Sequence, residues 1–495
     1  MRPRTRIPGW IKGSYLVSDE NCQILYTASN GEPVDQHESY LTSIALNKDG
    51  TIEMLDRLRM EVAVKAIAAS TDYFVLAQVD DLAKPYGKTS LEIVDISVPG
   101  GLMAAGESIH LAGHVNGGAN ISIAGTSLRV VSEYDWYEQT NTNYLQIFDI
   151  SDVHNAVAIS HDTFGNTERI TGTLFLEDRG FVNTLSFSTS SDGMGREERY
   201  FYTFKIVDAD NVTQNARLPI SNSDVAYHPV FGSTRLIGIG TKDRISNYEY
   251  KIVVNLYDVA DLETPKLLDN QEITLVDANR FSPTGFTVLE EAVLLEAEDG
   301  TQETGLMFVP FEGQEMIDDG RHGNMVYGVQ IFSFSPSTIT PRGTMLQNNT
   351  SVNSTIDLHE STKATLTHRD LTLVDISDSD TPETLGRLEL APIYEDFLVF
   401  GEFGARLKTL GIQEIPSEST EPTPNALLQI VSLSENPDNG TPLGSVQIIS
   451  DGFITQFGDH HVLTTHGTLL QVVDLSIPTT PRWSPHSISG SATSI

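Results

Sequence analysis

The stretch Leu371–Leu385, LTLVDISDSDTPETL, holds a run of β-forming residues, an aspartate that ends the run, a polar turn and a Thr-Pro pair. The phrase recurs along the chain, as LEIVDISVP from Leu91, LQIFDISDV from Leu145, FKIVDADNV from Phe204, VNLYDVADLETP from Val254 and LQVVDLSIPTTP from Leu469. Two further copies, VQIFSFSPSTITP and LQIVSLSENPDNGTP, carry Ser333 and Ser432 at the aspartate position. An internal repeat of this kind predicts a repeat architecture.

The aspartate of the phrase stands where a strand ends and a turn begins. A short carboxylate at that point can accept the backbone N–H groups of the turn. We therefore predict that the repeated aspartates are structural turn caps, and the alternative is a ring of catalytic carboxylates. The five positions are Asp95, Asp149, Asp258, Asp375 and Asp474.

The spacing of the phrase predicts the fold. Its anchors, from Ile44 to Val472, recur at intervals of 42 to 75 residues, and each interval has room for four short strands. Four-stranded antiparallel units at this period are typical of propeller blades. We predict an all-β chain with almost no helix, a single closed β-propeller over residues 1–495 with eight or nine blades. The nine repeat units span roughly 10–60, 61–110, 111–164, 165–221, 222–275, 276–349, 350–391, 392–450 and 451–495.

Composition narrows the function classes. The chain has 495 residues, 67 acidic against 31 basic, and a net charge of −36. Such a charge repels phosphate backbones, so we expect no nucleic-acid partner. Cys22 is the only cysteine, which excludes an internal disulfide. No run of apolar residues is long enough for a transmembrane helix, and MRPRTRIPGW has no apolar core of a signal peptide.

Four stretches carry a family resemblance: IKGSYLVSDENCQILYTASN from Ile11, HPVFGSTRLIGIGTKD from His228, IVVNLYDVADLETPKLLD from Ile252 and MVYGVQIFSF from Met325. Together they resemble the bacterial secreted β-propeller family that is distantly related to WD repeats. The DISxxxTP phrase is similar to the leucine-valine-isoleucine-valine-aspartate repeat of surface propellers. The resemblance implies a secreted, periplasmic or cell-surface protein without a settled activity. After Thr274 the chain has DANRFSPTGF where the family usually carries Asp-His-Lys.

In a blade, the connection between strands two and three lies on the same face as the linker to the next blade. The longest insertions lie in the connections between strands two and three, which predicts that the face carrying these connections is the working face. They span 80–89, 133–143, 189–198, 313–324 and 413–425. Tyr134, Trp136 and Tyr137 in one of them are candidate binding anchors. The alternative is that these rings fold back onto their own blade.

The linkers that lead into the inner strands should line the mouth of a central channel. As ligand-binding candidates among them we select Asp224, His228, Glu395, Asp396 and Asp451, beside further polar residues at Glu168, Arg169, Arg280, Asp357 and His359. A ring of carboxylates could hold calcium, although the chain has no EF-hand loop. We expect no cofactor otherwise. Asp459, His460, His461 and His466 suggest zinc, but successive strand residues point to opposite faces.

Two function classes follow. The first is a non-catalytic, monomeric binding module that meets a protein or a glycan through its long-loop face. The second is a propeller hydrolase or lyase with an acidic, cation-assisted site at the channel mouth. The sequence has no G-x-S-x-G elbow, P-loop or H-E-x-x-H motif. We therefore expect the binding module.

Overall fold

The computed structural model forms two compact units, Met1–Asn349 with Ser379–Thr381, and Thr350–Asp378 with Pro382–Ile495. The described residues are 10–18, 22–31, 38–47, 52–79, 88–134, 142–189, 195–208, 211–244, 249–273, 276–280, 285–293, 295–296, 300, 302–316, 322–347, 351–359, 361–367, 370–389, 394, 396–409, 424–434, 441–450, 454–457, 460–466, 469–483 and 488–489.

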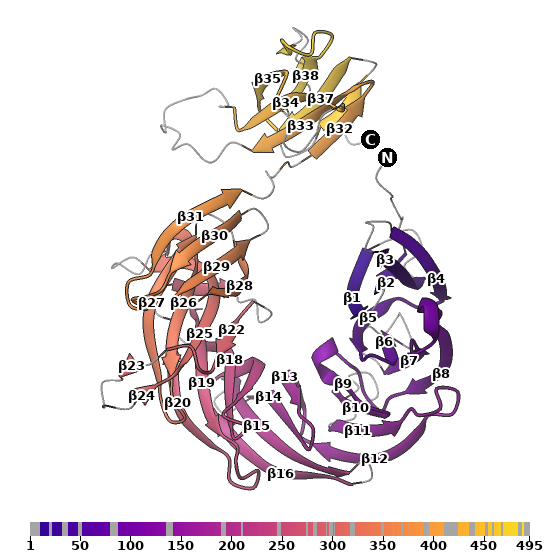
Figure 1. Cartoon of the computed structure of the whole chain (residues 1–495), viewed down its shortest axis with the longest axis vertical. Helices are drawn as coiled ribbons and strands as arrows, with labels where there is room; N and C mark the ends of the chain where they lie inside the picture. The colour runs from indigo at the N-terminus through magenta and orange to yellow at the C-terminus, as the bar shows by residue number, and fades with distance from the viewer. Residues whose placement is uncertain are drawn as a thin grey trace. The chain divides into compact units, whose positions relative to one another are not determined.

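These residues form strands and two short 3-10 helices, η2 (Pro99–Gly101) and η3 (Gly118–Asn120). The predicted all-β class is confirmed. Across the described ranges, no helix has the length and apolar character to span a bilayer. The strands build nine sheets of four or five antiparallel strands and one two-stranded sheet, and in most of the nine the strands pair in chain order. We number these nine sheets blades one to nine (Figure 1).

The first three blades take up the N-terminal part of the first unit. Blade one holds β1 (Trp10–Ser18), β2 (Cys22–Asn30), β3 (Ser39–Asn47) and β4 (Ile52–Met60). Blade two holds β5 (Val64–Ala69), β6 (Tyr73–Val79), β7 (Thr89–Asp95) and β8 (Ala104–His110). Blade three holds β9 (Ile121–Ala124), β10 (Ser127–Ser132), β11 (Asn143–Asp149) and β12 (Val157–Phe164).

The next three blades have longer strands. Blade four holds β13 (Glu168–Phe175), β14 (Arg179–Thr189), β15 (Gly195–Asp208) and β16 (Asn211–Ile220). Blade five holds β17 (Ser223–Val230), β18 (Arg235–Arg244), β19 (Glu249–Asp258) and β20 (Lys266–Glu272). Blade six holds β21 (Val276–Arg280), β25 (Gly305–Met316), β26 (His322–Phe334) and β27 (Ile339–Gln347), with β22 (Thr287–Leu289) also paired to β25 and a separate pair β23 (Leu295–Glu296) and β24 (Gln302–Glu303).

The second unit contains three blades. Blade seven holds β28 (Val352–His359), β29 (Thr362–Thr367), β30 (Asp370–Asp375) and β31 (Glu383–Glu389). Blade eight holds β32 (Asp396–Phe400), β33 (Phe403–Thr409), β34 (Ala426–Ser432) and β35 (Gly444–Ile448). Blade nine holds β36 (Ile454–Phe457), β37 (His461–His466), β38 (Leu469–Asp474) and β39 (Arg482–Trp483), with β40 (Ile488–Ser489) also paired to β38.

Each blade lies within one of the nine repeat units read from the sequence. The repeated phrase supplies the third strand of its blade and the turn that follows it, as in β30 of blade seven. The apolar residues of that strand are buried because successive blades pack face to face. One such core joins Tyr26 and Leu41 of blade one to Phe74 and Leu76 of blade two. Closure of the blades into one ring stays a prediction.

One irregularity repeats in the ladders between the third and fourth strands. The register shifts there in blades one to seven, for example between Ser43 and Ile44 and between Leu256 and Tyr257. An extra residue in one strand bends it and increases its twist. The recurring bulge therefore gives these outer strands a common curvature.

Aspartates in the outer strands connect successive blades. Asp56 of blade one accepts the backbone N–H of Met103 of blade two at 3.0 Å. Asp162 of blade three accepts the N–H of Gln214 of blade four at 3.0 Å. Asp269 of blade five accepts the N–H of Ile339 of blade six at 2.8 Å. We call these three contacts the aspartate clamps; they join odd-numbered blades to their successors.

Candidate functional site

The linkers between blades and the turns between strands two and three share one end of the blades. The linker residue His114 exchanges backbone hydrogen bonds with Glu133, which follows β10, at 2.9 and 2.8 Å. This contact agrees with the expected placement of both connections on one face. We call this end of the blades the linker face.

The repeated aspartates lie in the turns between strands three and four, at the other end of the blades. Each accepts the backbone N–H group two residues further along, at 2.8–3.1 Å. The prediction of turn caps is confirmed for all five. These hydrogen bonds lower the pKa of Asp375, where Ser361 and Ser377 donate, and of Asp474, where Ser476 donates. The donors are Ser97, Ser151, Ala260, Ser377 and Ser476.

Three neighbouring blades have long hairpins between strands two and three. The two strands have 11 and 14 residues in blade four, 10 and 10 in blade five, and 12 and 13 in blade six. In blades two and three they have 6 or 7. We call these three structures the long hairpins; β14–β15, β18–β19 and β25–β26 can be followed in Figure 1.

Two insertions predicted as loops are therefore partly paired strand, which corrects the sequence interpretation. Thr189 pairs with Gly195, and Gln314 pairs with Met325. Side chains on the hairpins are exposed: Phe187 keeps 60% of its surface and Met325 39%. Most of the other predicted insertions, 80–89, 133–143 and 413–425, lies outside the described residues.

Tyr134, in the loop after β10, is buried and not exposed as we expected. Tyr134 is only 4% exposed, so it is not the exposed anchor that we predicted, and the alternative of a ring packed onto the protein holds for it. Burial raises the pKa of its phenol. Its backbone N–H donates to the Asn143 side chain at 3.2 Å. Trp136 and Tyr137 lie outside the described residues.

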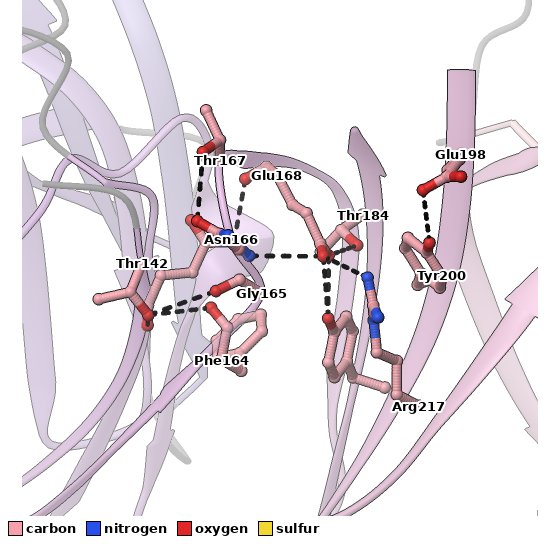
Figure 2. Close-up of polar contacts among 12 residues, drawn as sticks. Thr142, Phe164, Gly165, Asn166, Thr167, Glu168, Thr184, Glu198, Tyr200 and Arg217 are labelled. Carbon is pink, nitrogen blue, oxygen red and sulfur yellow. Dashed lines mark hydrogen bonds and ion pairs between the residues drawn. The ribbon is translucent and has the colours of Figure 1, made fainter. Parts of the chain in front are cut away.

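Glu168, at the start of β13, is buried, with 1% of its surface exposed. Figure 2 shows Thr184 and Arg217 directed at its carboxylate. Thr184 donates at 2.5 Å, Arg217 at 2.7 Å and the Tyr202 hydroxyl at 3.0 Å. Arg217 also lies over the Tyr200 ring, 3.4 Å from its centroid. The carboxylate is thus neutralised and hydrogen-bonded from within blade four.

Asp224, at the start of β17, is fully buried, which contradicts its expected place in a solvent-lined channel mouth. Its carboxylate accepts from the Asn222 amide at 2.7 Å, the Asn255 amide at 2.6 Å and the Tyr257 hydroxyl at 2.6 Å. Burial raises its pKa to about 7, and these three donors limit the rise. The group is an internal structural acid of blade five.

The remaining channel candidates have separate surroundings. His228 is half-buried on β17, 6.2 Å from the Phe286 ring, and burial lowers its pKa. Asp396 accepts the N–H groups of Phe397 at 2.8 Å and Ile454 at 2.9 Å, which ties blade eight to blade nine. Glu395 and Asp451 lie outside the described residues. His228 and Asp396 belong to different units, so the grouping of these four residues at one site stays a prediction.

The other polar residues of the sequence interpretation are described one by one where the structure shows their side chains. Asp357 pairs with Lys363 at 2.8 Å, and Arg169 is exposed on β13. His460 is exposed and His461 half-buried. Within the described ranges, no group of three or more His, Cys, Asp and Glu residues is arranged to hold a metal ion. The side chains of Arg280, His359 and His466, and all of Asp459, lie outside the description.

Sequence reasoning missed one compact polar cluster on the linker face. Glu133 and His114 are 1% and 2% exposed, and their Oε2 and Nε2 atoms lie 3.6 Å apart. Asn116 donates to Glu133 Oε1 at 2.6 Å, and the N–H of Ile170 in blade four donates to the same oxygen at 2.7 Å. We call Glu133, His114 and Asn116 the linker cluster. Glu133 stands 17 residues after Asn116 and 19 residues after His114, but nothing in the sequence marks it as their partner.

The charges around this cluster come from two more blades. Burial raises the pKa of the Glu133 carboxyl, and Arg169 of blade four and Lys65 of blade two act against that rise. Burial lowers the pKa of the Lys65 ammonium, and Glu133 raises it. A carboxyl, an imidazole and two cations from three neighbouring blades therefore influence one another. Such a set can bind an anion or exchange a proton.

The order of strands within the blades defines the chain as a repeat protein of the β-propeller type. No family model matches it, and no curated protein does. It is similar to the β-propeller domain of the Trilobed protease from Pyrococcus furiosus, with 10% identity, 76% of this chain and 97% of that chain covered, and a TM-score of 0.35. It is also similar to Sqt1 from Chaetomium thermophilum, with 9% identity, 77% of this chain and 90% of that chain covered, and a TM-score of 0.41. A protein from Lactobacillus plantarum has 11% identity, with 74% of this chain and 96% of that chain covered, and a TM-score of 0.38. Membership in the secreted propeller family stays a resemblance.

Proposed function

We propose that the chain is a non-catalytic binding module that meets a protein or glycan partner through its linker face, outside the cytoplasm or at the cell surface. The observation that carries the proposal is the set of long hairpins on blades four, five and six. Three adjacent extensions on one face enlarge the surface that a partner can contact, and loops and extensions gathered on one face of a repeat array mark its binding side.

The buried acids of these blades support binding over catalysis. Glu168 and Asp224 receive donors from within their own blades, as described above. Glu303 of blade six is fully buried and accepts from Thr340 at 2.7 Å and Arg342 at 3.1 Å. A carboxylate that is engaged in this way is a support of the fold, because proton transfer to a substrate needs access.

The net charge of −36 indicates the partner's chemistry. An acidic surface favours a basic partner or one bridged by cations, since complementary charge speeds the encounter. Phe187 and Met325 on the long hairpins supply apolar contact area for such a partner. Exposed aromatic and methionine side chains are enriched in interfaces.

The test is a double substitution on the hairpins. We expect Phe187→Ser with Met325→Ser to leave the unfolding temperature unchanged and to weaken binding of a partner isolated by cross-linking at least about tenfold. The matched control changes two exposed apolar residues at the opposite end of the blades, Leu102→Ser between strands three and four of blade two and Val157→Ser at the start of β12. Equal affinity of the hairpin variant and the wild type, measured by calorimetry, contradicts the proposal.

A second function is favoured by the linker cluster. Glu133 is a buried acid with a raised pKa beside His114 and near Arg169, the kind of set that a hydrolase or lyase uses. If the protein turns over a glycan or ester, we expect Glu133→Gln to abolish turnover while the hairpin variant retains it. Turnover by the Glu133→Gln variant at the wild-type rate excludes this alternative.

A further inference from the structure

The linker cluster contains an exposed member that covers two buried ones. Glu133 and His114 are 1% and 2% exposed, whereas Asn116 is an exposed residue of the linker between blades two and three. Because Asn116 is exposed, a rotation of its side chain into solvent would uncover Glu133 and His114.

The hydrogen bonds of Asn116 show what the two buried groups recognise. Its Nδ2 atom donates to Glu133 Oε1 at 2.6 Å, and its Oδ1 atom lies 2.9 Å from His114 Nε2. Because the carboxylate accepts, the amide must donate to it, and its oxygen then accepts from the imidazole. Glu133 and His114 thus bind opposite ends of one amide group. Asn116 is an internal occupant of this position.

The second oxygen of Glu133 is less engaged than the first. Oε1 receives both the Asn116 amide and the Ile170 N–H, whereas Oε2 lies 3.6 Å from His114 Nε2, beyond hydrogen-bond distance. In Glu168, by comparison, one oxygen receives Thr184 and Tyr202 and the other receives Arg217. The linker cluster therefore keeps acceptor capacity that a purely structural carboxylate uses up.

Two cations bias the site toward a negatively charged ligand. Arg169 directly precedes Ile170, whose N–H group binds Glu133, and its side chain is exposed. Lys65 is the residue at the register shift of β5, between Val64 and Ala66, and it interacts electrostatically with Glu133. In a protein with a net charge of −36, these two cations give a ligand's carboxylate a local attraction.

We propose that the linker cluster is a binding site for a ligand that carries an amide next to a carboxylate, as at the C-terminus of a peptide. The ligand's amide replaces the Asn116 side chain between Glu133 and His114, and its carboxylate lies toward Arg169 and Lys65. This site is independent of the long hairpins, so it can hold or fail whatever the outcome of the hairpin test.

The experiment uses the full chain and three probes: N-acetylglycine, which has both groups, acetamide, which has only the amide, and acetate, which has only the carboxylate. Binding is measured by calorimetry for the wild type and for Asn116→Ala, Glu133→Gln and the control Asn166→Ala. Asn166 is the corresponding exposed asparagine in the linker between blades three and four. Thermal unfolding checks that each variant is folded.

We expect N-acetylglycine to bind Asn116→Ala about tenfold more tightly than the wild type, because the internal occupant is gone. Glu133→Gln should weaken binding at least about tenfold, and Asn166→Ala should leave it unchanged. Three results overturn the proposal: no binding of N-acetylglycine to Asn116→Ala, acetate bound as tightly as N-acetylglycine, or Glu133→Gln equal to the wild type. If Glu133→Gln does not fold, the Asn116→Ala variant decides alone, because Asn116 is exposed.

Discussion

Glu168 and Asp224 are acids near the start of the first strand in neighbouring blades, β13 and β17, and both are buried. Glu168 receives the Arg217 guanidinium, whereas Asp224 receives two amides and one phenol and no cation among the described residues. Neutral donors satisfy the lone pairs of a carboxylate but do not compensate its charge. The two blades thus stabilise a buried acid in different ways, and in blade five burial raises the pKa of Asp224 to about 7.

The largest expected effect is a pH dependence that originates at Asp224. Its pKa is about 7 in the folded chain and near 3.8 when exposed, so the folded state binds the proton more tightly. Its contribution to stability is present below pH 3.8 and is lost as the pH rises through 7. We expect the free energy of unfolding to fall by on the order of 3 kcal/mol between pH 5 and pH 8 from this group.

Chemical unfolding of the wild type and of Asp224→Asn over this range measures the effect. The asparagine does not titrate, so its stability should vary less with pH by that amount. Tyr227 and Tyr257, the ionisable neighbours, have pKa values raised well above the ordinary phenol value and stay neutral. If the free energy of unfolding depends on pH in the same way for both proteins, Asp224 is not the source of the pH dependence.

The second prediction concerns Glu168 and its ion pair with Arg217. Arg217→Met should leave the Glu168 charge buried without its cation, at a cost of about 2–3 kcal/mol in the free energy of unfolding. The side chain of Arg217 is 43% exposed, so water replaces part of the interaction and keeps the cost below that of a fully buried pair. The matched control is Lys242→Met, which breaks the more exposed Lys242–Glu272 pair. It should cost less than about 1 kcal/mol.

The third effect concerns the glycines that face these acids. A Cβ atom on Gly238 would lie 2.6 Å from Oδ2 of Asp224, whose two carboxylate oxygens together accept from three donors. Gly165 faces Glu168 at 3.1 Å and has a φ of +67°. We expect Gly238→Ala to cost about 2 kcal/mol through overpacking and Gly165→Ala about 1 kcal/mol through backbone strain. Thermal unfolding of both variants gives the ranking, and a reversed order would show that the Asp224 side chain can move.

The smallest effect belongs to the turn caps. Asp149→Ala removes the acceptor of the Ser151 N–H and should cost about 1 kcal/mol, by analogy with the loss of a helix cap. Asp149→Asn keeps an oxygen at the same place and should cost only a few tenths of a kcal/mol. Equal losses for the two variants would mean that charge, and not the hydrogen bond, stabilises the turn.

The turn caps and the blades could be predicted because their information is local. Each aspartate and the N–H group it binds stand two residues apart, and each blade is one continuous stretch of chain. The surroundings of Asp224 could not be predicted, because Asn255 and Tyr257 come from another strand, 31 and 33 residues away. The same holds for Glu133, which binds the Ile170 N–H across 37 residues and a blade boundary.

The long hairpins could not be predicted for a different reason. Arg196, Glu197, Glu198 and Arg199 look like an exposed loop, because strands are usually recognised by alternating apolar residues. They nevertheless pair with the residues from Leu185 to Ser188, since a hairpin that projects from a blade needs no buried face. Tyr134 was misjudged in the same way, because the sequence does not reveal that its ring packs inward.

The aspartate clamps have a consequence for synthesis on the ribosome. Asp56, Asp162 and Asp269 stand 106 and 107 residues apart, and each accepts a backbone N–H group of the blade that is synthesised next. Blades one, three and five therefore each emerge with one carboxylate oxygen that gains its donor only when the next blade has been made. At roughly 5–20 residues per second, the nascent chain acquires one completed pair about every 5–20 s. Cotranslational folding of the first unit should accordingly proceed in steps of two blades, and a chain truncated after blade two should resist proteolysis better than one truncated after blade three.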